Sequence, residues 1–141
     1  MTPQAALQQT LAGEHAAVYV YGVLGGRVSA SAQASLATRL SSAYVVHRGR
    51  RDQLVAMVRA GGADPVASEV SYELPNPSRT PAQLAAAALV VERRCAAVYA
   101  AMVGSTARAN RQWAIDALAD SAVRQLTFGG APEPFPGVGE L

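Results

Sequence analysis

The long segment from Gly61 to Arg79 restricts the possible folds of this chain more than any other feature. It is rich in glycine, proline, serine and asparagine, and Pro65, Pro75 and Pro77 prevent a continuous helix through it. On both sides of it, apolar residues recur every three or four positions, which is the spacing of amphipathic helices. No stretch alternates apolar and polar residues convincingly enough for a strand, although residues 66–74 have room for a short extended piece. The chain is therefore predicted to be all-α.

Each half of the chain contains two predicted helices. Thr2-Pro3 and Thr80-Pro81 place a capping hydroxyl before a proline, which is typical of a helix start, and Ser105 is the predicted cap of the last helix. The predicted helices span residues 3–24, from 29 or 31 to 60, 81–104 and 105–126, and an irregular tail begins at about residue 128. The inner face predicted for the last helix consists of Ile115, Leu118, Ala119, Ala122 and Leu126.

The lengths of the connections predict the topology. Short turns follow the first and third helices, so each half forms an antiparallel hairpin. The 61–79 segment is long enough to run along the whole bundle, which allows the second and third helices to lie parallel. A single long crossover distinguishes ferritin-like bundles from up-and-down bundles. Residues 1–141 are therefore predicted to form one ferritin-like four-helix domain.

Composition excludes several classes of protein. Half of the 141 residues are hydrophobic and 16% are charged, which is typical of a globule with one core and not of a disordered chain. A formal net charge of +2 is too small to favour nucleic acid as a partner. The longest apolar stretch, residues 85–91, is too short to cross a bilayer. We expect neither a nucleic-acid partner nor a membrane partner.

The cysteine content and the N-terminal residues predict the compartment. Cys95 is the single cysteine, so no internal disulfide can form. The opening residues, MTPQAALQQTL, have neither the basic region nor the continuous apolar region of a secretion signal. The predicted location is the cytoplasm.

Ferritin-like bundles can hold a di-metal carboxylate centre, so the sequence can be searched for its ligands. Such a centre needs an inward Glu from each of two helices and a Glu-x-x-His motif from each of the other two. Glu14 and Glu92 fit the two single positions, and His47 fits one histidine, but Tyr44 stands where its carboxylate belongs. The last helix has no Glu or His, and its Asp116 and Asp120 are predicted to lie away from the inner face. At most three of the six ligands remain.

These residues belong to a wider resemblance that covers nearly the whole chain. The segments on which the resemblance rests are residues 14–19 (EHAAVY), 47–52 (HRGRRD) and 72–75 (YELP), together with a late Pro-Phe-Pro-Gly. With them the chain resembles the ferritin-like superfamily, and in particular an uncharacterised family of alanine-rich proteins from actinobacteria. The resemblance implies the bundle fold. The incomplete ligand set departs from what the superfamily's oxidase, peroxidase and iron-storage activities require.

A metal-free polar layer is the interpretation that we favour for Glu14, His47 and Glu92. Buried carboxylates are costly unless they are paired, and Arg50 or Arg51 on the His47 helix is predicted to neutralise them. Tyr44 is the predicted neutral donor that replaces a missing ligand. Cys95 is predicted to be a small core residue and not a nucleophile.

Three functional hypotheses follow from this pattern. The first is a bundle without a di-metal centre and without a cofactor, which acts as a structural or binding module. The second is a divergent redox protein that binds iron or manganese through Glu14, His47 and Glu92. The third is a carrier that holds an unidentified small ligand between the helices.

A homodimer through the first helix is the predicted assembly. Residues 16–24 are apolar on every side, and Tyr19, Val20 and Val23 point away from the direction of Glu14. A second copy would cover such a face. The alternative is that the 61–79 crossover covers it within one chain.

Overall fold

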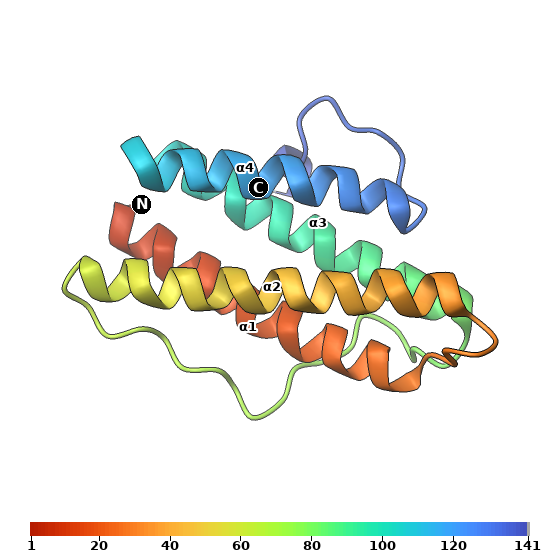
Figure 1. The fold of residues 1–141 in the computed structure, drawn as a ribbon. Helices are drawn as coiled ribbons and strands as arrows, with labels where there is room; N and C mark the ends of the chain where they lie inside the picture. The colour runs from red at the N-terminus through yellow and green to blue at the C-terminus, as the bar shows by residue number, and fades with distance from the viewer. Residues whose placement is uncertain (141) are drawn as a thin grey trace.

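A computed structural model describes residues 1–140 as a bundle of four long helices (Figure 1). The helices are α1 (Pro3–Arg27), α2 (Ala34–Ala60), α3 (Pro81–Ser105) and α4 (Arg108–Thr127), and a short 3-10 helix, η1 (Val138–Glu140), lies in the tail. No strand forms within residues 1–140, and residues 66–74 are irregular. The predicted all-α class is confirmed.

The predicted starts of α1 and α3 are confirmed by their caps. The Thr2 hydroxyl accepts a hydrogen bond from the backbone N–H of Ala5 at 3.1 Å. The Thr80 hydroxyl accepts from the N–H of Gln83 at 3.2 Å, and the Gln83 side chain accepts in return from the N–H of Thr80. Each cap satisfies amide groups that have no partner within the helix.

Three predicted boundaries are wrong by a few residues. α1 continues past its glycine pair to Arg27, whose guanidinium donates to the backbone oxygen of Pro77 at 3.0 Å. α2 begins only at Ala34. Ser105 does not cap α4 but ends α3, and α4 begins after Ala107 without a side-chain cap. The first of these boundaries depends on a tertiary contact that local sequence does not contain.

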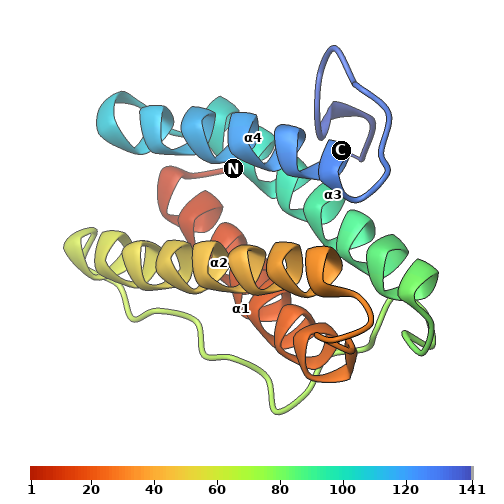
Figure 2. The same ribbon diagram turned by 45° about the vertical axis from the view of Figure 1, so that its right-hand side comes forward.

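The helices follow the predicted topology. In Figures 1 and 2, α1 and α2 form one antiparallel hairpin and α3 and α4 form the other. The 61–79 crossover runs back along the bundle, so that α2 and α3 are parallel (Figure 1). A four-helix bundle with one long crossover is therefore the fold of this chain.

The crossover is attached to α1 by side chains of that helix. Gln8 donates to the backbone oxygen of Asp64 at 2.7 Å and accepts from the N–H of Val66 at 2.9 Å. The rings of Tyr19 and Tyr72 pack at 5.6 Å. The Gln8 side chain thus satisfies backbone hydrogen-bonding groups of the crossover that no strand pairs with. Tyr72 covers part of the α1 face for which a dimer contact is predicted.

Two apolar clusters form the core, one toward each end of the bundle. The larger surrounds Tyr21, Leu24 and Leu40, and the smaller surrounds Leu11 and Leu54. Buried polar residues lie along the same helix faces between these clusters. Burial of the apolar side chains supplies the main driving force for folding.

The inner face predicted for α4 is wrong. Ile115 and Leu126 are 42% and 45% exposed, whereas the buried residues of α4 are Ala114, Ala117, Ser121 and Gln125. Small inner residues leave room for the tyrosines of α1 and α3 at the bundle centre. Periodicity alone selects the bulkier stripe, because it contains no information on what fills the opposite side.

The tail folds back onto α3. Gly137 has a φ of +79° and packs so closely on the backbone of Ala96 that a Cβ would not fit. Among the helices of residues 1–140, none combines the length and hydropathy that a bilayer span requires.

Candidate functional site

A histidine held between two carboxylates occupies the centre of the bundle. His47 Nδ1 lies 2.7 Å from Glu14 Oε2, and His47 Nε2 lies 2.9 Å from Glu92 Oε1. All three side chains are fully buried. They come from α2, α1 and α3 respectively, so the cluster joins three helices. Because both ring nitrogens face carboxylate oxygens, His47 is an imidazolium that donates from both nitrogens.

Three hydroxyl groups also donate to the two carboxylates. Tyr99 donates to Glu14 Oε1. Tyr21 donates to Glu92 Oε1 at 2.6 Å, and Ser121 donates to Glu92 Oε2 at 2.7 Å. Each of the four oxygens of the two carboxylates therefore accepts a hydrogen bond from the protein, which is what burial of such groups requires.

The two tyrosines are placed by one repeated spacing. Tyr21 follows Glu14 by two helical turns on α1, and Tyr99 follows Glu92 by two turns on α3. Each tyrosine crosses to the glutamate of the other helix. The Tyr21 ring also stacks on His47, with centroids 5.3 Å apart and planes 18° apart. The paired Glu-x6-Tyr spacing is the sequence signal that could have identified both donors.

Two arginines extend the network toward the surface on the α2 and α4 side. Arg50 donates to the Tyr99 hydroxyl at 3.2 Å and is paired with Asp120. Arg124 donates to Asp120 Oδ2 at 2.7 Å, and the same nitrogen lies 3.9 Å from Glu92 Oε2. Asp120 is 45% exposed in its side chain, so it is the point at which the network meets solvent.

The charges of this network balance. Its cations are His47, Arg50 and Arg124, and its anions are Glu14, Glu92 and Asp120. Buried charges are tolerated only when they are paired and hydrogen-bonded. The interlocked pairs meet that condition without any added ion.

The protonation of the network follows from burial and partners. Burial disfavours the imidazolium, but the hydrogen bonds from both ring nitrogens to the Glu14 and Glu92 carboxylates outweigh burial, so the pKa of His47 lies well above its ordinary value of 6.5. Burial alone raises the pKa of Glu92, yet His47, Tyr21 and Ser121 hold it below its ordinary 4.5. Burial raises the pKa of the Cys95 thiol above 9.0. Near neutral pH, His47 is charged and Cys95 is not.

Two predicted members of the polar layer lie elsewhere. Tyr44 is half-buried on α2 and packs beneath the Arg48 guanidinium at 5.8 Å. Arg51 is paired with its neighbour Asp52 at 2.8 Å. Arg50 is the arginine that enters the network, because one residue along a helix turns the side chain by about 100°.

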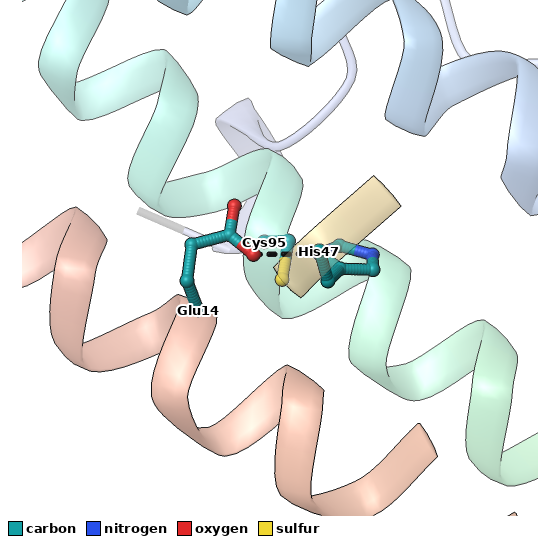
Figure 3. Close-up of side chains that lie close together, drawn as sticks. All are labelled: Glu14, His47 and Cys95. Atoms are coloured by element: carbon teal, nitrogen blue, oxygen red, sulfur yellow. Dashed lines mark hydrogen bonds and ion pairs between the residues drawn. The ribbon is translucent and has the colours of Figure 1, made fainter. Parts of the chain in front are cut away.

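Cys95 brings a sulfur beside the cluster. Single ligand atoms of Glu14, His47 and Cys95 lie within 4.8 Å of one another, and Figure 3 shows the three side chains converging from three helices. A di-metal centre of the ferritin-like type does not fit these residues. Only one histidine faces the centre, and α4 presents Ser121 where the second Glu-x-x-His motif would be needed.

An all-α bundle with one long crossover and a buried carboxylate–histidine–tyrosine network is the class of protein that these observations define. The chain belongs to the family described as "Domain of unknown function (DUF4439)", which matches residues 6–140. It is similar to the crystal structure of a conserved hypothetical protein, rv2844, from Mycobacterium tuberculosis, with a TM-score of 0.81 and 30% sequence identity. That match covers 89% of this chain and 87% of the mycobacterial chain. No curated protein matches the sequence.

Proposed function

We propose that this protein is a ferritin-like bundle whose centre is a metal-independent polar layer, and that it acts as a structural or binding module. The observation that supports this proposal is that both ring nitrogens of His47 lie within hydrogen-bond distance of carboxylate oxygens, and that every oxygen of Glu14 and Glu92 has a hydrogen-bonding partner in the protein. With both carboxylates ionised, His47 donates from both nitrogens. A metal ion needs lone pairs on its ligands. An imidazolium has none, so an ion would have to displace protons that two carboxylates already stabilise.

The cytoplasm is the compartment that we assign to this module. A buried cysteine without a disulfide partner supports this assignment, because reducing compartments preserve free thiols.

Metal content after purification without a chelator tests the metal-free centre. We expect far less than one equivalent of iron, manganese or zinc per chain by elemental analysis. The expected result is the same after incubation with each divalent ion followed by desalting. One or two equivalents per chain, lost in Glu14→Ala or Glu92→Ala but kept in the exposed control Glu69→Ala, would contradict the proposal.

A metal-dependent redox protein is the second candidate, and the geometry of Cys95 favours it. Glu14, His47 and Cys95 form a compact set of oxygen, nitrogen and sulfur donors. Such a set suits a single transition-metal ion such as iron better than a pair. Titration with Co²⁺ separates this candidate from the first one. An intense thiolate charge-transfer band that disappears in Cys95→Ser would support it, and a spectrum identical to that of Co²⁺ in buffer would exclude it.

Homodimerisation through α1 is the assembly that we propose for the module. The predicted outward position of Val20 is wrong, because Val20 is buried in the core of the single chain, whereas Tyr19 and Val23 remain partly exposed. We expect light scattering to give a mass of about 29 kDa, twice the 14.6 kDa of the chain, which falls to the monomer in Val23→Glu without loss of helicity. A wild-type monomer at every concentration would assign this face to the crossover, whose Tyr72 already packs on Tyr19.

A further inference from the structure

A groove runs between α1 and α3 next to the crossover, and we call it the α1–α3 groove. Its volume is about 300 Å³. The floor is formed by small or branched apolar residues, among them Ala16 and Val20 of α1 and Val91 of α3. The sulfur-bearing Cys95 also lines it, so the groove lies directly above the buried network. Clefts of this size with an apolar floor are typical of small-molecule sites and too small for a docked helix.

Packing on both sides keeps this groove open. At Gly13 the two helices approach so closely that a Cβ would lie 3.3 Å from Val98 Cγ2, which leaves no space for further closure. The crossover is supported by the packing of Tyr72 on Tyr19, so it forms a wall beside the floor. The bulky residues thus lie at the margins, and the alanines leave the space between them.

Two charged side chains form the rim. Arg94 of α3 and Glu73 of the crossover both line the groove and are exposed. Neither makes an ion pair or a side-chain hydrogen bond with any residue in the range 1–140. This contrasts with Arg50 and Arg124, whose guanidinium groups are engaged. The Arg94 guanidinium is therefore available for a carboxylate, which it can bind through two parallel hydrogen bonds.

We propose that the α1–α3 groove binds a small amphipathic carboxylate, with its apolar part on the alanine and valine floor and its carboxylate on Arg94. The apolar floor requires a hydrocarbon body, and the free guanidinium at the rim selects an anionic head. The Glu73 carboxylate opposes such a head, so the proposal assigns the dominant contact to Arg94, whose guanidinium can make two parallel hydrogen bonds to a carboxylate. This inference deepens the binding role proposed above and rests on it.

Calorimetric titration of the 141-residue chain with octanoate tests the assignment. We expect saturable binding of one octanoate per chain. Arg94→Gln should weaken it about tenfold or more, which is the loss of a charge-assisted contact worth about 1.4 kcal/mol. The control Arg59→Gln changes an exposed arginine of α2 that also lacks a partner and should leave the affinity unchanged.

Two further variants locate the ligand and fix the sign of its charge. Ala16→Leu fills the floor and should abolish binding while preserving helicity, whereas Ala56→Leu on the exposed side of α2 should not affect it. Glu73→Gln removes repulsion and should tighten octanoate binding. Absence of binding, or equal affinity for octanol with no effect of Arg94→Gln, would overturn the proposal. Tighter binding of octylamine that depends on Glu73 would also overturn it.

The titration and the metal analysis can fail separately. A metal-free protein that does not bind octanoate would refute the groove assignment and leave the metal-free centre intact. A metal-loaded protein that binds octanoate through Arg94 would do the reverse.

Discussion

Replacing His47 by alanine is expected to lower the free energy of unfolding by about 3–5 kcal/mol or more, the usual cost of removing one partner from a buried ion pair. The variant leaves Glu14 and Glu92 facing each other without the cation that each of them touches. Since a domain of this size is stable by only about 5–15 kcal/mol, much of the fold's stability would be lost. Chemical denaturation followed by circular dichroism measures the effect.

Two controls separate the charge from the volume of the lost ring. His15→Ala removes a partly exposed histidine with one hydrogen bond to the Val66 backbone and should cost about 1 kcal/mol or less. Adding Glu14→Gln and Glu92→Gln to His47→Ala should restore part of the stability, because neutral amides do not repel each other as the two carboxylates do. A triple variant less stable than the single one would show that the penalty is mainly a cavity effect.

Local signals in the sequence were enough to predict where α1 and α3 begin. The Thr80 and Gln83 side chains form their capping box within one helical turn, so no distant residue is needed. The end of α1 is not predictable from local signals, because Arg27 donates a hydrogen bond to the backbone of Pro77, a residue of the crossover. The buried face of α4 is not predictable for a similar reason. Which stripe is buried depends on the tyrosines that fill the bundle centre from other helices.

The centre of the site was partly predictable. Glu14, His47 and Glu92 lie at the middle of apolar stripes, and the structure brings their side chains into contact. Their function stays a prediction. The hydroxyl donors Tyr21 and Tyr99 are not recognisable from the sequence alone, because a tyrosine on an apolar helix face indicates a core aromatic residue until the partner of its hydroxyl is known.

His47 should determine how the free energy of unfolding depends on pH in the neutral and alkaline range. The folded-state pKa of His47 is raised above the ordinary 6.5, so the folded protein holds a proton that the unfolded chain releases above that pH. Stability from this proton is complete below pH 6.5 and is lost as the pH rises toward the folded pKa. On the acid side, the lowered pKa of Glu92 gives stability above 4.5 that is lost as the pH falls.

We therefore expect the free energy of unfolding to fall above pH 6.5 by about 1.4 kcal/mol per pH unit, the value for one proton, until the folded pKa is reached. Cys95 and the two tyrosines, whose pKa values are raised above 9.0 and 10.0, do not contribute below pH 9. Denaturation curves at intervals between pH 6 and pH 9 measure the slope. His47→Gln should remove it, and His15→Gln should preserve it. A flat wild-type profile in this window would show that His47 is neutral in the folded protein and that one carboxylate carries the shared proton instead.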